Sequence, residues 1–151
     1  MIRVLVLDGP NLNLVGTREP EIYGHETLGE IHASIATYAA ELGLAVDFFQ
    51  SNHEGLLIDR LHARDFDAAI VNAGGLTHTS VALRDALLAI ARPFIEVHLS
   101  DPSTREPFRH VNFLVDVAEA SIVGQGPRGY LLALDAIAAR YAAAPTEAPD
   151  G

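Results

Sequence analysis

The feature that most constrains the fold of this chain is a regular alternation of short apolar runs with amphipathic segments. Five apolar runs lie at residues 2–7, 44–49, 68–71, 94–99 and 121–123, and helix-like apolar spacing appears at 27–43, 53–64, 79–91 and 128–143. Strands that are covered on both faces read as continuous apolar runs. We therefore predict an α/β fold: a flavodoxin-like, doubly wound five-stranded parallel sheet with strand order 2-1-3-4-5.

A chain of 151 residues is long enough for one domain with a substantial core. We expect a single α/β domain at residues 1–143 and a flexible tail at 144–151. Thr27 with Glu30, and Ser51 with Glu54, have the spacing of capping boxes at helix starts. Gly43 stands where the first helix should end.

The composition removes several kinds of chemistry. The chain has no Cys, and all ten of its cationic side chains are Arg. An enzyme with this sequence therefore has no thiol nucleophile, no thiolate metal ligand, no Schiff-base lysine and no P-loop lysine. The available chemistry is that of His, Tyr, Arg, carboxylate, amide and hydroxyl side chains.

Charge and hydropathy bear on the expected partners. A formal net charge of −10 disfavours nucleic acid and anionic membranes, which bind basic surfaces. No apolar run approaches the ~18 residues of a membrane span, and the opening run is too short for a signal peptide. We expect a cytoplasmic protein that acts on a small molecule. A mean hydropathy of +0.19 suggests that some apolar surface is buried in a homo-oligomer.

Polar residues follow the apolar runs that should form the central strands. Asn11 comes after the first run, Asn52 after the second, and the segment 72–80 at the end of the third. The carboxyl ends of parallel strands meet at one edge of the sheet, where ligands bind in such folds. The sequence therefore predicts a binding site at that edge.

The connection between the first strand and the first helix spans about residues 9–26, which is long for an α/β domain. Gly16 and Gly24 are plausible hinges of a lid that carries Arg18 and Tyr23. A nearby cation favours the phenolate, and lowering a tyrosine pKa by about 2–3 units requires roughly 3–4 kcal/mol. Tyr23 is thus a candidate base activated by Arg18; an ordinary solvated loop is the alternative.

Glu96 and His98 lie two residues apart in the fourth run, so their side chains should point to the same face of the strand. A carboxylate beside an imidazole orients the ring and favours its protonated form, which makes His98 a candidate proton donor. A satisfied core histidine is one alternative. A metal site with His78 is another, although the spacing matches no common metal motif.

Two further groups of residues could bind an anion. Residues 74–80 combine glycines and hydroxyl side chains before a predicted helix, where they serve either as an anion site or simply as a helix cap. Arg105 and Arg109, four residues apart, could hold a carboxylate or hydroxyl groups. We predict a binding role for Arg109 and a surface position for Arg105.

Taken together, these segments resemble type II 3-dehydroquinate dehydratase, a small enzyme of the shikimate pathway. The matching stretches are residues 6–14, 16–20 with Tyr23 and Gly24, 50–55, 72–85, 96–100, 105–110 and 129–130. They occur in order along nearly the whole chain, and six co-ordered motifs are far more specific than any one of them alone.

The resemblance implies trans-dehydration of 3-dehydroquinate to 3-dehydroshikimate through an enolate, with no cofactor and no metal. Carried over by position, Tyr23 removes the C2 proton and Arg18 keeps its phenolate ionised. His98, oriented by Glu96, protonates the departing C1 hydroxyl, and a water near Asn11 stabilises the enolate. The implied substrate-binding residues are Asn72, Leu99 and Ser100 for the carboxylate, His78 and Arg109 for the ring hydroxyls, and Asp85 from a neighbouring subunit.

The family assembles as trimers packed into a dodecamer, so the resemblance also implies a homo-oligomer of this kind. The type I enzyme removes the same water with a Schiff-base lysine, which this chain lacks. The reaction serves both aromatic amino-acid biosynthesis and quinate catabolism, and the residues do not choose between them.

Several positions depart from the family pattern. Asp101 stands where Asn is usual, Asn112 replaces a commoner Ser, and Gln125 lies in a turn that is usually more apolar. We expect these departures to affect affinity and assembly more than activity. Two other functions remain open: a flavodoxin-like module that binds a nucleotide or FMN, and an inactive oligomeric scaffold, which would not need the candidate catalytic side chains.

Overall fold

The five apolar runs form the strands of one parallel sheet, in the order β2-β1-β3-β4-β5. The computed structural model describes residues 1–17 and 19–143, so Arg18 and the predicted tail 144–151 lie outside the described residues. The strands are β1 (Arg3–Asp8), β2 (Ala45–Gln50), β3 (Ala68–Asn72), β4 (Phe94–His98) and β5 (Ala120–Val123). The predicted fold class and strand order are confirmed.

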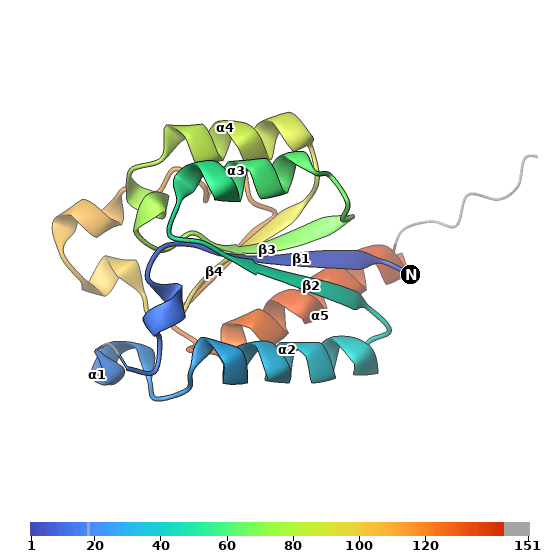
Figure 1. The fold of residues 1–151 in the computed structure, drawn as a ribbon, viewed down its shortest axis with the longest axis horizontal. Helices are drawn as coiled ribbons and strands as arrows, with labels where there is room; N and C mark the ends of the chain where they lie inside the picture. The colour runs from blue at the N-terminus through green and yellow to red at the C-terminus, as the bar shows by residue number, and fades with distance from the viewer. Residues whose placement is uncertain (18, 144–151) are drawn as a thin grey trace, which may run out of the picture.

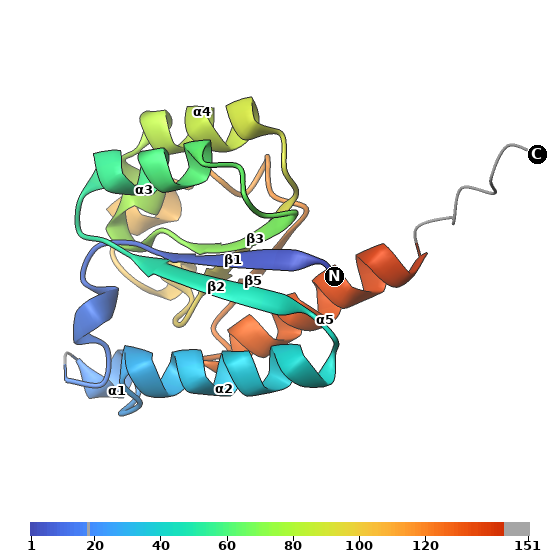
Figure 2. The ribbon, with the colours of Figure 1, turned by 45° about the vertical axis from the view of Figure 1, so that its right-hand side comes forward.

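Helices cover both faces of this sheet. The longer helices of the described chain are α2 (Leu28–Glu41), α3 (Glu54–His62), α4 (Val81–Ile90) and α5 (Arg128–Ala143), each within two residues of its predicted bounds. Figures 1 and 2 show α3 and α4 on one face and α2 and α5 on the other. Within the described residues, no helix has both the length and the apolar character needed to cross a bilayer.

Short helical segments occupy the connections at the carboxyl ends of the strands. They are η1 (Leu12–Leu14) and α1 (Pro20–Tyr23) after β1, η2 (Gly74–His78) after β3, and η3 (Pro102–Thr104) and η4 (Pro107–His110) after β4. The long first connection is therefore partly helical. Gly16 and Gly24, the predicted hinges, have φ values of +91° and +81°, which a glycine adopts without strain.

The central strands are buried on both faces, which explains their continuous apolar pattern. In β1, Val4 and Val6 pack in the core beneath α2 and α5, whereas Leu5 and Leu7 pack in the core beneath α3 and α4. One run of residues thus contributes to two hydrophobic cores because successive side chains of a strand point to opposite faces.

The edge strands differ from the predicted pattern. Every residue of β2 is only partly buried, and β5 is largely exposed. The expectation that all five runs are covered on both faces is therefore wrong for these two strands. Each has a neighbouring strand on one side only and lies at the rim of the helical layers.

Two of the three predicted helix signals are confirmed. The Thr27 hydroxyl accepts the Glu30 N–H at 3.2 Å at the start of α2. Gly43 follows α2 with a φ of +73°, which stops the helix. Ser51, however, does not cap α3: the cap is His53, and the Ser51 hydroxyl accepts the His53 N–H at 2.9 Å in a turn before the helix.

Gly9 lets the loop after β1 approach the loop after β3. Its N–H donates to the Asn72 carbonyl at 2.8 Å, and a Cβ on Gly9 would lie 2.3 Å from the Ala73 carbonyl oxygen. A methyl group cannot be accommodated so close to backbone, so this position requires glycine. The close approach brings together the loops that carry Asn11 and Asn72.

Replacement of Gly9 by Ala should lower the free energy of unfolding by about 2 kcal/mol or more, because backbone must move to admit the Cβ. Gly55→Ala is the matched control, since a Cβ at this position of α3 meets no atom within 4 Å. It should raise stability by about 0.5 kcal/mol through helix propensity. Urea denaturation measures both; equal stability of the two variants would contradict the proposed close approach.

Candidate active site

A pocket of about 190 Å³ opens at the carboxyl ends of β1, β3 and β4. It lies where the order of strands along the sheet reverses, which is the usual ligand position in such folds. Predicted site residues in its lining are Asn11, Asn72, His78, His98, Leu99, Ser100 and Arg109. The structure therefore brings together side chains from the ends of β3 and β4 and from the connections that follow β1, β3 and β4, as the topology predicted.

Glu96 and His98 are both buried and lie close together on β4. The side chain of Glu96 is fully buried behind His98, and the His98 Nε2 atom is 3.4 Å from Glu96 Oε2. At this distance the contact is an ion pair rather than a well-formed hydrogen bond. Neither atom has a hydrogen-bond partner among the described residues. His98 Nε2 is buried against Glu96, while the residue as a whole contributes to the pocket lining.

The second oxygen of Glu96 is held by two side chains from outside the strand. Glu96 Oε1 accepts hydrogen bonds from Asn112 Nδ2 at 3.0 Å and from the Ser121 hydroxyl at 2.7 Å. Burial raises the pKa of Glu96, but contacts with His98, Ser121 and Asn112 outweigh this effect and place the pKa below its ordinary value of 4.5. Glu96 is therefore ionised at neutral pH.

Sequence reasoning missed the contact between Asn112 and Glu96. Asn112 was expected to influence affinity and assembly, whereas its side chain binds the carboxylate next to the candidate proton donor. Its departure from the family pattern was the available signal. The partner could not be named from sequence because Asn112 lies 16 residues from Glu96, in an irregular segment.

His78 presents a defined tautomer to the pocket. Its Nδ1 atom lies 2.6 Å from the Val111 carbonyl, which can only accept, so Nδ1 carries a proton. Burial lowers the pKa of His78, and the hydrogen bond to Val111 opposes this without reversing it, so the pKa lies below 6.5. The ring is therefore neutral at pH 7, and its Nε2 atom can accept a hydrogen bond from a ligand hydroxyl.

The prediction that Arg105 is a surface cation is wrong. Arg105 lines the pocket together with Arg109, and its side chain is 14% exposed. The loop after β4 folds back through η3 and η4, which turns both arginines toward the pocket. An ion pair of 3.8 Å between Arg105 and Glu19 connects this loop to the segment just before α1. Two arginines thus line the pocket, Arg105 paired with Glu19 and Arg109 paired with Glu106.

Asn11 is held in an unusual backbone conformation. Its φ of +71° lies in the left-handed region, which Asn tolerates better than most residues. The Asn11 N–H donates to Asn52 Oδ1 at 2.9 Å, and Gln50 Nε2 donates to the same oxygen at 3.2 Å. Asn52, which follows β2, thereby positions a pocket residue although it does not line the pocket itself.

Some residues near the predicted site have side chains that make their contacts outside the pocket. The Ser80 hydroxyl accepts the Leu83 N–H at 2.8 Å and so caps α4, whereas glycines of η2 line the pocket. The carboxylate of Asp101 accepts hydrogen bonds from the N–H and the hydroxyl of Ser103, so its negative charge is stabilised by contacts with η3. Asp85 is exposed on α4 and does not line the pocket of its own chain.

The candidate base and its cation are not described by the structure. Arg18 and the side chain of Tyr23 lie outside the described part, although the backbone of α1 ends at Tyr23. Their roles stay predictions. Within residues 1–17 and 19–143, no group of three or more His, Asp or Glu side chains is arranged to hold a metal ion, and this includes the set of Glu96, His98 and His78.

Ser121→Ala should destabilise the protein by about 1–2 kcal/mol at pH 7, because it removes a hydrogen bond to a buried carboxylate. Glu96 has a lowered pKa in the folded state, so its interactions stabilise above pH 4.5 and are lost as the pH falls through its folded-state pKa. The difference from wild type, measured by urea denaturation, should therefore shrink as the pH falls from 4.5 through the lowered folded-state pKa of Glu96.

Ser103→Ala is the matched control, since its hydroxyl donates to an exposed carboxylate at the same distance of 2.7 Å. Its backbone N–H bond to Asp101 remains, so the loss should be below about 0.5 kcal/mol. A loss in Ser121→Ala that stays constant down to pH 3 would contradict the proposed interaction with ionised Glu96.

Known proteins share both the sequence and the fold of this chain. The sequence model of the family described as Dehydroquinase class II matches residues 2–138. The chain is 55% identical to 3-dehydroquinate dehydratase 1 of Ralstonia nicotianae over 141 residues, which cover 91% of this chain and 90% of that protein. It is 56% identical to the 3-dehydroquinate dehydratase of Methylococcus capsulatus over 139 residues, with coverages of 90% and 94%.

A crystal structure of type II dehydroquinase from Propionibacterium acnes matches with a TM-score of 0.88 at 38% identity, over 92% of this chain and 97% of the other. The resemblance read from the motifs is thereby confirmed. The chain belongs to the class II dehydroquinase family of hydro-lyases.

Proposed function

We propose that this enzyme removes water from 3-dehydroquinate by trans elimination through an enolate, as a cofactor-independent step of the shikimate pathway in the cytoplasm. The observation that carries the proposal is the buried pair of Glu96 and His98 at the wall of a pocket that two arginines line. The names of the similar dehydratases support the substrate.

The pocket complements a ring that carries a carboxylate and hydroxyl groups. Arg105, Arg109 and Asn72 offer N–H donors, and Leu99 with Ser100 adds backbone and hydroxyl groups. Neutral His78 supplies the opposite property, an acceptor for a hydroxyl proton. Charged donors at one end and an acceptor at the other can fix the orientation of the ring.

His98 acts as the general acid in this proposal. The base takes the C2 proton, and the electron pair of that bond forms the enolate. When the enolate collapses, a C1–C2 double bond forms, the C1–O bond breaks, and the leaving hydroxyl takes a proton from His98 to depart as water. The negative charge of Glu96 stabilises the imidazolium before this transfer. A water near Asn11 would donate to the enolate oxygen.

Tyr23 acts as the base, with Arg18 close to its phenolate. The ion pair between Glu19 and Arg105 supports this assignment, because it ties the segment that precedes α1 to the pocket wall. A lid held in this way would exclude water from the phenolate and strengthen its attraction to the arginine.

The enzyme is further proposed to be a homo-oligomer, a dodecamer built from trimers. Val81 and Leu88, with exposures of 52% and 51%, flank Asp85 on the outer face of α4. This apolar face is consistent with a subunit contact in which Asp85 reaches the site of a neighbour. A solution mass that equals the monomer at micromolar concentration would contradict the oligomer.

With 3-dehydroquinate, purified enzyme should produce the absorbance of a conjugated enone. Tyr23→Phe and His98→Ala should each lower kcat at least about 100-fold, since each removes a proton-transfer group. Tyr141→Phe and His62→Ala are control substitutions outside the pocket lining and should retain activity. Absence of turnover in the wild type would refute the function; near-normal rates in a folded Tyr23 or His98 variant would refute that residue's role.

Arg18→Ala should move the acidic limb of the pH–rate profile to higher pH. Loss of the cation lets the phenolate pKa rise toward its ordinary value of about 10, so more base is needed to ionise it. The pH profile of kcat/KM measures this effect. An unchanged profile with a lower kcat would show that Arg18 closes the lid without acting on the phenolate.

A further inference from the structure

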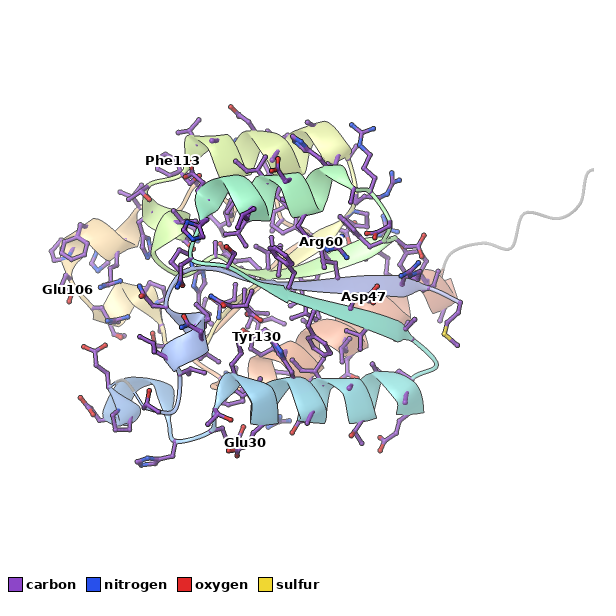
Figure 3. All side chains as sticks on the ribbon, in the orientation of Figure 1. Glu30, Asp47, Arg60, Glu106, Phe113 and Tyr130 are labelled. Carbon is purple, nitrogen blue, oxygen red and sulfur yellow. The ribbon has the colours of Figure 1, made fainter. Side chains whose placement is uncertain are left out.

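A chain of hydrogen bonds runs from the pocket into the core. Asn72 Nδ2 donates to the Tyr130 hydroxyl at 3.0 Å, and Tyr130 donates to Asp8 Oδ1 at 2.5 Å. Asp8 Oδ2 lies 2.8 Å from His32 Nε2 on α2. Tyr130 and Asp8 are both 0% exposed, and Figure 3 shows Tyr130 in the interior between the sheet and α2. The proposed chemistry uses neither of these buried groups.

The donor and acceptor roles in this series of hydrogen bonds are fixed. Burial and the negative charge of Asp8 hold the pKa of Tyr130 well above its ordinary value, so the hydroxyl keeps its proton. That single proton is donated to Asp8. Toward Asn72, the Tyr130 oxygen can therefore only accept, and the side chain of Asn72 must turn its NH₂ group to the tyrosine.

The oxygen atom of the Asn72 side-chain amide is held by the backbone. Asn72 Oδ1 accepts the Gly74 N–H at 3.3 Å, and a backbone N–H cannot accept in return. A flipped amide would place NH₂ against this N–H and a carbonyl against the lone pairs of Tyr130. Both contacts would be lost, so one orientation is strongly preferred.

The orientation of the side-chain amide determines whether Asn72 presents a hydrogen-bond donor or an acceptor to a ligand. Nδ2 has two protons, and Tyr130 uses one of them. Asn72 lines the pocket, so the second N–H is the group available to a bound molecule there. A donor attracts a carboxylate oxygen, whereas a flipped amide would present lone pairs and repel it.

We infer that Tyr130 and Asp8 are positioning residues, which hold the Asn72 amide with an N–H toward the pocket and so favour a ligand that carries a carboxylate. This inference rests on the proposed function for the identity of that ligand, the ring carboxylate of 3-dehydroquinate.

Tyr130→Phe removes the acceptor that fixes the amide. We expect KM for 3-dehydroquinate to rise about tenfold, and kcat to stay within about threefold because His98 and Glu96 are untouched. The Kd of quinate, which carries the same carboxylate but no ketone, should weaken by a similar factor in calorimetry. Turnover by the wild type tests the proposed function, and the Kd ratio tests the inference, so the two can fail separately.

Tyr38→Phe is the matched control. The Tyr38 hydroxyl donates to Asp135 at 2.5 Å, the same length as the bond from Tyr130 to Asp8, and neither residue lines the pocket. This variant should keep the KM and Kd of the wild type. Unchanged KM and Kd in a folded Tyr130→Phe variant would overturn the inference, as would equal increases in both tyrosine variants.

A second pair of variants tests the carboxylate of Asp8. Asp8→Asn retains an oxygen that accepts from Tyr130, so KM should stay within about threefold, whereas Asp8→Leu frees the tyrosine proton for Asn72 and should raise KM about tenfold. Equal KM values in the two variants would overturn the role of Asp8.

A measurement on the wild type covers the case in which the core variants do not fold. In ¹⁵N-labelled protein, quinate should shift one of the two Asn72 side-chain amide protons much more than the other, because only one faces the pocket. The signal is assigned by its loss in Asn72→Ser. Equal shifts of both protons, or no shift of either on binding, would overturn the inference.

Discussion

Burial of the central strands between two layers of helices is the constraint on which the rest of this structure depends. Any side chain on β1, β3 or β4 must either be apolar or find polar partners. The buried polar side chains of these strands are Asp8, Asn72, Glu96 and His98, all of them at or towards the carboxyl ends. The same constraint that makes the strands apolar therefore concentrates the buried polar groups at one edge of the sheet.

The partners of these groups come from outside the sheet and form two separate networks. Glu96 is held by an irregular segment and by the neighbouring strand β5. Asp8 and Asn72 are joined through Tyr130 of the last helix. The first network holds one oxygen of Glu96 and leaves the other facing the imidazole of His98, and the second leaves one amide N–H of Asn72 without a partner in the part of the chain that the structure describes. Packing requirements and ligand recognition are thus met by the same residues.

Much of the candidate site followed from sequence because topology alone places the ends of neighbouring parallel strands together. Strand order and the position of polar residues at or after the strand ends were enough to place most of the lining residues at this edge, whereas the family resemblance supplied their individual roles in substrate binding. Arg105 was misjudged for the opposite reason: whether it lies in solvent or in the pocket depends on the path of an irregular loop. Ser51 was misread because its capping-box spacing also fits a turn that precedes the helix.

The sequence by itself determined the strand order, the edge of the sheet that carries the pocket and the proximity of Glu96 and His98, because each depends on local periodicity and on the rules of parallel sheets. Only the tertiary structure decided which residues orient that site. Asn72 meets Tyr130 across 58 residues, and Glu96 meets Ser121 across 25. Contacts of this kind arise where separate elements pack against one another, and no local pattern in the chain encodes them.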